Sequence, residues 1–227
     1  AGNLTIASIT GAGGGATNDI TLISGTGTTT VTGAIATSID DLTLQEGAAT
    51  STGAVALQGN VTAVGLVTFG QAYDVSMTGA TVAITNDTNF LNTGTTTLGN
   101  ATADSLTFTG GLGAVAGAIN AAGTINTTNT AADFGAITLT AAGQDLTIDT
   151  GTGAGNLTIA SITGAGGTSN FQLISGTGTT TVTGNIGTSI NNLTLQENAA
   201  SSTGAVALQG NVTAVGLVTF AQAYDVS

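Results

Sequence analysis

The residues that could carry acid–base or nucleophilic chemistry in this chain are limited to Asp, Glu, Ser, Thr and Tyr. None of the 227 residues is Lys, Arg, His or Cys, and twelve carboxylates give a formal net charge of −12. Two carboxylates alone could cleave a glycosidic bond, and Asp40-Asp41 is the best such pair. Its equivalents in a second copy of the segment are Asn191-Asn192, and adjacent strand residues point to opposite faces. We therefore expect a solvated role beside a turn, in a protein that is not an enzyme, and keep a carboxylate-based polysaccharide-degrading enzyme as an alternative.

Metal binding has candidates among the carboxylates, because unpaired carboxylates suit a hard cation such as calcium. Two positions keep their charge in both copies, and Asp87 lies in the oxygen-rich run 86–89. The competing interpretation is turn chemistry and solubility, since Asp bonds its own backbone in turns. The chain lacks the glycine–aspartate nonapeptide of calcium-binding solenoids. We therefore expect no cofactor and favour the turn interpretation, and we keep calcium as an alternative with these candidate ligands: Asp87, Asp74, Asp225, Glu46 and Glu197.

The charge balance also bears on partners. Nucleic acids and anionic membrane surfaces are bound through Lys and Arg, so neither is expected as a partner. No run of 18 apolar residues predicts a transmembrane segment, and no charged leader precedes an apolar stretch. The unpaired carboxylates predict mutual repulsion between molecules, which acid or divalent cations would relieve.

Short alternating segments predict β-strands throughout. Large apolar residues alternate with Thr or Ala in runs such as Leu4-Thr5-Ile6 and Asp41-Leu42-Thr43-Leu44, and clusters of Gly, Asn, Asp and Ser separate them. This pattern is typical of half-buried strands joined by turns. The alternation predicts that these side chains point inward: Leu4, Ile6, Leu42, Leu44, Leu157 and Leu195. The few aromatic rings are expected in the core or at corners.

A long internal repeat decides between all-β architectures. Residues 1–14 recur unchanged at 154–167, and residues 22–76 recur at 173–227 with seven differences. A sandwich would have to end and restart at each copy, whereas a solenoid continues its sheets through the join at 149–156. We predict one parallel β-helix (β-solenoid) over residues 1–227, with repeat copies at 1–76 and 154–227 and intervening coils at 77–153. Eight to eleven coils of about 20–30 residues would form a rod of roughly 40–50 Å.

Threonine-rich runs raise a further alternative. A flat hydroxyl array such as that in Thr28-Thr29-Thr30 could order water, which would indicate an ice-binding protein. That function needs an unbroken Thr-x-Thr column on one face, and Asn3, Asp41, Ala54 and Ala83 would interrupt it. With 48 Thr in the chain, such runs are expected by chance.

The rod's ends point to assembly. An uncapped terminal coil exposes unpaired backbone groups, and the chain has no Lys, Pro or helix candidate to block them. Open head-to-tail docking would give a filament. The partner we expect is therefore another copy of the chain, end to end.

Strings such as GNLTIASITGAGG, DLTLQ and STGAVALQGNVTAVGLVTF resemble the β-strand repeats of large bacterial surface and exported proteins, including filamentous-haemagglutinin-like adhesins. The resemblance covers the whole chain, rests on composition, and carries over no functional residue. It implies a β-helix shaft in an extracellular or cell-surface setting. We therefore expect a structural protein that forms or stiffens an extracellular filament, with the shaft of an adhesin as the alternative.

Overall fold

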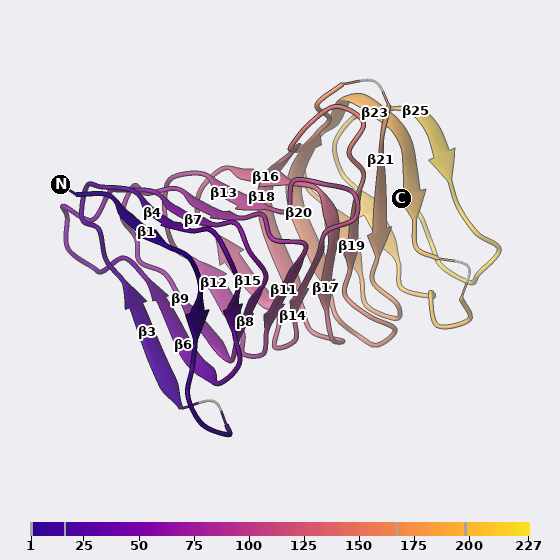
Figure 1. The fold of residues 1–227 in the computed structure, drawn as a ribbon. Helices are drawn as coiled ribbons and strands as arrows, with labels where there is room; N and C mark the ends of the chain where they lie inside the picture. Colours follow the sequence, from indigo (N-terminus) through magenta and orange to yellow (C-terminus); the bar gives the residue numbers. More distant parts are fainter. Residues whose placement is uncertain (1, 16, 167, 198) are drawn as a thin grey trace.

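The protein is a stack of short parallel strands. The structure is a computed structural model that describes residues 2–15, 17–166, 168–197 and 199–227. The chain winds into a β-solenoid of about nine turns, with parallel pairing between successive turns (Figure 1). The predicted fold class is confirmed. Among the described residues no helix has the length and apolar character needed to cross a membrane.

Three sheet faces surround the core. Face 1 contains β1 (Leu4–Ile6), β4 (Thr29–Val31), β7 (Val55–Leu57), β10 (Val75–Met77), β13 (Thr96–Leu98) and β16 (Ile119–Ala121). Face 2 contains β2 (Ile9–Thr10), β5 (Ile35–Ala36), β8 (Val61–Ala63), β11 (Thr81–Ile84), β14 (Ser105–Phe108), β17 (Gly123–Thr127), β19 (Leu146–Asp149) and β21 (Ser169–Ile174). Face 3 contains β3 (Asn18–Leu22), β6 (Ile39–Leu44), β9 (Gly65–Val67), β12 (Thr88–Phe90), β15 (Leu112–Val115), β22 (Thr180–Val182) and β24 (Val206–Leu208).

Four longer strands turn a corner and belong to two faces. β18 (Ala132–Leu139) and β20 (Leu157–Thr163) pass from face 3 to face 1, and β23 (Ile186–Leu195) and β25 (Val212–Val218) pass from face 1 to face 2. β18 pairs with β20 and β19 with β21, so the sheets run on through the join at 149–156.

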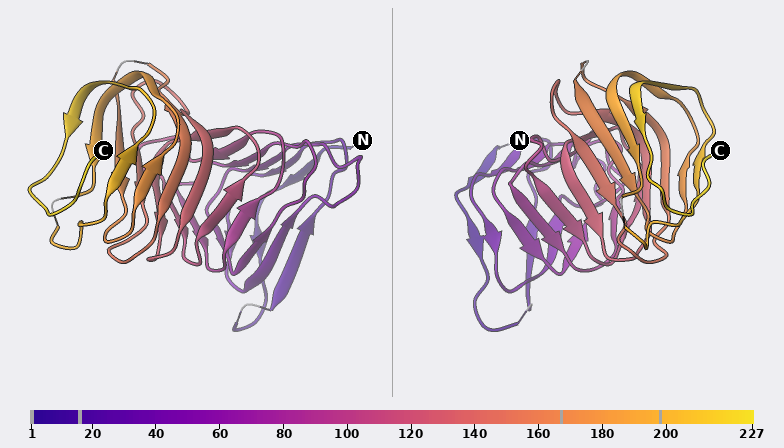
Figure 2. Two further views of the ribbon diagram at one scale, coloured as in Figure 1. Left: turned by 180° about the vertical axis from the view of Figure 1, so that it is seen from behind. Right: turned by 90° about the vertical axis from the view of Figure 1, so that its right-hand side faces the viewer.

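The stacking fixes the length of the rod. On face 1, nine pairing steps lead from Leu4 to Val212, and neighbouring parallel strands lie about 4.8 Å apart. These steps correspond to roughly 43 Å of axial rise, in agreement with the predicted 40–50 Å. Figure 2 shows the same stack from behind and from one side.

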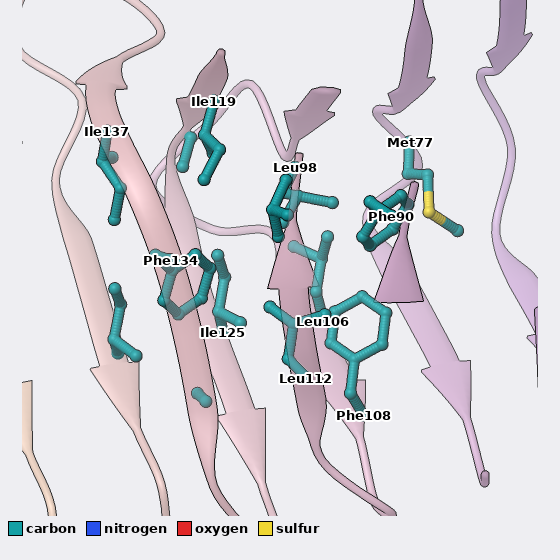
Figure 3. Close-up of a cluster of buried hydrophobic side chains, with 14 of the residues drawn as sticks. Met77, Phe90, Leu98, Leu106, Phe108, Leu112, Ile119, Ile125, Phe134 and Ile137 are labelled. Atoms are coloured by element: carbon teal, nitrogen blue, oxygen red, sulfur yellow. The ribbon is translucent and has the colours of Figure 1, made fainter. Parts of the chain in front are cut away.

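The core is a column of inward side chains from all three faces. Phe90 of face 3 and Phe108 of face 2 meet edge to face, with ring centroids 6.1 Å apart, and aliphatic side chains fill the space around them (Figure 3). Leu42 and Leu44 of the first copy and Leu157 and Leu195 of the second are fully buried as predicted. Leu4 is 37% exposed and Ile6 is half-buried. Both pair in register with the buried Thr29 and Val31, so they lie on the core side as predicted, and Ile6 packs against the core. Leu4 stays partly exposed because it lies in the first coil and no described coil packs beneath it.

Buried polar side chains fix the corners of the coils. Gln45 and Gln196 lie at equivalent positions, are fully buried, and adopt positive φ values of 65° and 61°. The Nε2 of Gln196 donates to the Gly204 carbonyl at 2.7 Å, and its Oε1 accepts from the Ser175 N–H at 2.9 Å. Gln45 makes the same pair of bonds in the first copy. Because a buried amide must be satisfied, these residues set the path of the chain at this corner.

A tyrosine fixes a second kind of corner. The Tyr73 hydroxyl accepts from the Phe69 N–H at 2.9 Å and donates to the Leu44 carbonyl at 3.0 Å. Burial raises the pKa of Tyr73 above its ordinary value of 10.0, while hydrogen bonds with Phe69 and Thr68 act in the opposite direction. Tyr224 makes the equivalent bonds in the second copy, to Phe220 and Leu195.

The two repeat copies lie one face apart around the rod axis. Leu4 of the first copy lies on face 1, whereas its equivalent, Leu157, lies on face 3. From Leu4, six full turns on face 1 reach Ile137, and two further strands reach Leu157. The repeat is therefore one strand short of seven turns. In Figure 1, β3 and β6 lie at the lower left, whereas their second-copy equivalents β21 and β23 lie at the upper right.

Candidate functional site

Several of the twelve carboxylates accept backbone N–H groups at a turn or from a neighbouring coil. Asp104 accepts the Asn100 and Ala101 N–H groups at 2.8 and 3.0 Å, and Asp149 accepts the Gly151 N–H at 2.7 Å. Asp74 accepts the N–H of Thr95 in the next coil, at 2.7 Å. Each of these carboxylates satisfies backbone groups that a turn would otherwise leave unpaired.

The Asp40-Asp41 pair does not follow strict strand alternation. The register of β6 against β3 shifts here, so both Asp residues lie between the buried Ile39 and Leu42, and neither is buried. The expectation that the two side chains point to opposite faces is wrong, because a β-bulge inserts one extra residue into the strand. Asp41 instead lies over the next coil, where only a glycine, Gly65, leaves room for its carboxylate. No cleft forms beside the pair in the described part of the chain.

The candidate calcium ligands lie apart from one another. Glu46 accepts a 3.4 Å hydrogen bond from Ser51, and Asp87 accepts one of 3.4 Å from Asn89. Glu197, Asp74 and Asp225 lie on other coils, and among the described residues no three His, Cys, Asp or Glu side chains group as metal ligands. Calcium binding by any of them stays a prediction.

The threonine runs place every second residue inside the rod. Thr29 and Thr96 are fully buried, between outward neighbours. The outward column on face 1 passes from Thr30 to Ala56, Ser76 and Thr97, so an alanine interrupts its hydroxyl groups.

The largest unpartnered apolar surface lies on the last coil. Val215, Leu217 and Val226 are 82%, 57% and 45% exposed, and Val212 is 42% exposed. These residues belong to the C-terminal coil, which we define as Val212–Ser227. Its upper strand edge also has no neighbour among the described residues. Apolar side chains and unpaired backbone groups therefore coincide on one surface.

A duplicate of this surface lies inside the same molecule. Residues Val61–Ser76, the interior coil, differ from the C-terminal coil only by Gly70 in place of Ala221. Their apolar side chains are covered: Val61 and Val75 are 1% and 0% exposed, and Leu66 is 6% exposed. Two nearly identical sequences thus have opposite environments, and stacking alone accounts for the difference.

Polar side chains of the interior coil, and of Asn60 directly before it, also bind the coil above. The Oδ1 atoms of Asn60 and Asp74 accept the N–H groups of Thr81 and Thr95 at 3.1 and 2.7 Å. The hydroxyl of Thr68 donates to the Asn89 carbonyl at 2.9 Å and accepts the Leu91 N–H at 2.8 Å. These bonds join β9 to β12, where no ladder pairing is present.

The equivalents of these three residues at the end of the rod are Asn211, Thr219 and Asp225. All three are exposed, and their side chains make no hydrogen bond within the described part of the chain. The C-terminal coil and Asn211, which directly precedes it, therefore present three apolar residues, Val212, Leu217 and Val226, and three polar side chains. The duplicates of these apolar residues are buried, and those of the polar side chains are hydrogen-bonded to a neighbouring coil.

The first coil is the complementary end. Leu4 is 37% exposed, whereas its equivalent Leu157 is fully buried and has Ala132 of β18 beneath it in the preceding coil. Ile23 is 45% exposed, and its equivalent Ile174 is 6% exposed. Both ends of the described rod thus expose sequence that is buried elsewhere in it.

Comparison of the chain with protein-family models, curated proteins and solved structures gave no match.

Sequence reasoning did not identify the end residues Leu217, Thr219 and Asn211 as a surface. It identified the uncapped ends in general terms, because no blocking residue is present. The repeat could have identified these residues, because residues 212–227 align with residues 61–76, whose side chains are covered by the coil that follows them.

Proposed function

We propose that this protein is a structural rod that forms or stiffens an extracellular filament through end-to-end stacking of β-solenoid coils. The observation that supports this proposal is the pair of uncovered end coils. Each exposes side chains whose duplicates are buried by a neighbouring coil in the same molecule. Burial of such apolar surface and pairing of the open strand edges would both favour docking.

The adhesin shaft is the second candidate. The rod has a narrow core, small outward side chains and no cleft among its described residues, which suits a spacer. The resemblance of its strings to bacterial surface-protein repeats supports an extracellular or cell-surface setting. In this alternative the coils continue along one covalent chain, and binding takes place elsewhere.

Sedimentation velocity of the unmodified chain over a wide concentration range tests the filament. Self-assembly predicts species that grow with concentration, and negative-stain images should then show threads. Leu217→Lys, which places a charge on the exposed end surface, should reduce association by at least about tenfold. The control Thr62→Lys places the same charge on an exposed side position in the middle of the rod and should leave end-to-end association in place. A monomer that persists at the highest concentration contradicts self-assembly and supports the covalent shaft.

A further inference from the structure

The ladder on face 3 is interrupted between β9 and β12, although the two strands are neighbours in the stack (Figure 1). β3, β6 and β9 form a sheet of their own, and all other described strands belong to the large sheet. On faces 1 and 2 the same two coils stay paired, through Val55–Val75 and Val61–Val82. Among the described strands, no other boundary between successive coils lacks a ladder on one face. We call this boundary the seam, and it lies where the interior coil meets residues 77–153, the middle segment between the repeat copies.

The length of one corner explains the interruption. In the lower coil a single residue, Val64, joins β8 to β9. In the upper coil the corner between β11 and β12 has three residues, 85–87. The N–H groups of Thr85 and Asn86 both bond to the Val64 carbonyl, at 3.1 and 2.7 Å, so the longer corner starts β12 at a position where it does not pair with β9. The ladder resumes one coil later, where the corner between β14 and β15 again has three residues, 109–111.

The hydroxyl of Thr68 takes the place of a ladder partner at the seam. In a parallel ladder, one residue uses its N–H and its C=O to bond the residues on either side of its neighbour. The Thr68 hydroxyl likewise donates to the Asn89 carbonyl and accepts the Leu91 N–H, which flank Phe90. A hydroxyl can replace both backbone groups because it is a donor and an acceptor. Thr68 is buried, so the two bonds lie out of bulk water.

We propose that the seam is a hinge, held closed by the Thr68 hydroxyl, at which the rod opens and bends along face 3 while the ladders on faces 1 and 2 stay paired. Between its corners, face 3 is joined here by two hydrogen bonds of one side chain, whereas β6 and β9 pair at three positions. In a solenoid each coil contacts only its neighbours, so one weak boundary opens without loosening the rest of the stack. The hinge goes beyond the proposed function, because it belongs equally to a filament of stacked rods and to an adhesin shaft.

Apolar packing limits how far the seam opens. Leu66 of β9 and Phe90 of β12 point inward on either side of it and are buried. Phe90 also packs edge to face on Phe108. Full separation would expose these side chains to water, which is unfavourable. The expected motion is therefore a local opening that breaks the two Thr68 bonds and closes again, and not the unfolding of a coil.

Amide hydrogen exchange of the full chain, labelled with 15N-leucine and followed by NMR, tests the hinge. The Leu91 N–H reports on its bond to Thr68, and Leu98 is the internal reference because its strand, β13, is paired on both sides. We expect the Leu91 amide to exchange at least about tenfold faster than the Leu98 amide. Equal protection of the two amides would overturn the proposal.

Three variants separate the hydroxyl bonds from general stability. Thr68→Val keeps the shape of the side chain but removes donor and acceptor, so it should accelerate exchange at Leu91 by a further factor of about ten and leave Leu98 unchanged. Thr68→Ser keeps the hydroxyl and should stay within about threefold of the original rate at Leu91. Thr219→Val, in the duplicate sequence, is the matched control and should not alter Leu91. An unchanged Leu91 in Thr68→Val, or equal acceleration of Leu91 and Leu98, contradicts a hinge closed by this hydroxyl.

Paired spin labels measure the bending itself. The chain has no Cys, so labels attach only to introduced pairs. Thr21 and Ala114 point outward on face 3, four coil-to-coil steps apart across the seam. Thr5 and Thr97 point outward on face 1 at the same separation, roughly 19 Å. Thr68→Val should broaden the distance distribution of the face-3 pair alone. A broadening shared by the face-1 pair, or absent from both pairs, argues against a hinge on face 3.

Discussion

The interior coil, 61–76, and the C-terminal coil, 212–227, are almost the same sequence in two environments. In the first, Leu66 is 6% exposed, and in the second the equivalent Leu217 is 57% exposed. The difference shows that burial in this protein belongs to the stack and not to the individual coil. In a solenoid each unit contacts only its neighbours, so stability depends on nearest-neighbour interfaces. Matched substitutions in the two copies can therefore measure the interfaces directly.

The largest expected difference comes from the buried leucine. Leu66→Ala should lower the free energy of unfolding by about 2–4 kcal/mol, because it removes packed methyl groups and leaves a cavity. Leu217→Ala should lower it by less than about 1 kcal/mol, since much of that side chain is already in water. Urea denaturation of both variants at low protein concentration checks the pair. Equal losses would mean that the end coil is covered in solution.

A glycine pair should give the next largest effect. A Cβ on Gly53 would lie 1.7 Å from the carbonyl oxygen of Gly27 in the neighbouring coil. Gly53→Ala should therefore destabilise the rod by about 1–3 kcal/mol through overpacking. Gly70→Ala, which installs the residue that the second copy has at Ala221, should change the midpoint of thermal unfolding very little. If both variants unfold alike, the coil-to-coil contact at Gly53 is not as close as the structure shows.

The tyrosine corners predict a difference in alkaline stability. The pKa of Tyr73 is raised above 10.0, chiefly by burial, so the folded state holds its proton more tightly than the unfolded state. The sign follows from linkage: this contribution is complete below pH 10 and is lost as the pH rises above it. Tyr73→Phe should remove this loss, at a cost of about 1–3 kcal/mol at neutral pH for the unpaired Leu44 carbonyl and Phe69 N–H.

Tyr224→Phe serves as the control for the alkaline experiment, because its hydroxyl makes the same two bonds on a half-buried side chain. It should cost less at neutral pH and leave the alkaline loss in place. Unfolding midpoints recorded from pH 8 to 11 compare the two variants. An alkaline loss that survives Tyr73→Phe would place its origin elsewhere.

The smallest expected effect concerns the outer face at the bulge. Asp19, Asp40 and Asp41 correspond to Asn170, Asn191 and Asn192. In the second copy, the side-chain Nδ2 atoms of Asn191 and Asn192 each donate to the side-chain Oδ1 of Asn170, at 3.1 and 3.2 Å. Carboxylates cannot donate such bonds, and like charges on neighbouring strands repel.

Changing all three Asp residues to Asn should therefore stabilise the first copy by about 0.2–1 kcal/mol at low salt. The gain should shrink in 1 M salt, where charges are screened beyond roughly 3 Å. Thermal unfolding at the two salt concentrations measures it. A loss of stability would show that the carboxylates are held by a favourable contact, such as a bound cation.

Local patterning was sufficient to predict much of this architecture. Alternation of Leu, Ile and Val with Thr identifies the strands, because successive side chains of a strand point to opposite faces. Thus Leu42, Leu44, Leu157 and Leu195 were placed in the core correctly. Continuation of the pattern across 149–156 also indicated a solenoid, since no linker chemistry separates the copies.

Three features depended on the closed coils. The bulge at Asp40-Asp41 arises from the register between β3 and β6, and strict alternation could not reveal it. The exposure of Leu4 depends on its place at the end of the stack, because its sequence is the same as that around the buried Leu157.

The rotation between the copies is the clearest case. The sequence by itself determined that residues 1–76 return at 154–227, that both form strands, and that the strands stack in parallel. Only the tertiary structure decided that the second copy begins on face 3 instead of face 1. The physical reason is that a face is assigned by hydrogen bonding to the coil beneath, so the number of strands in the middle segment determines which way the next copy points.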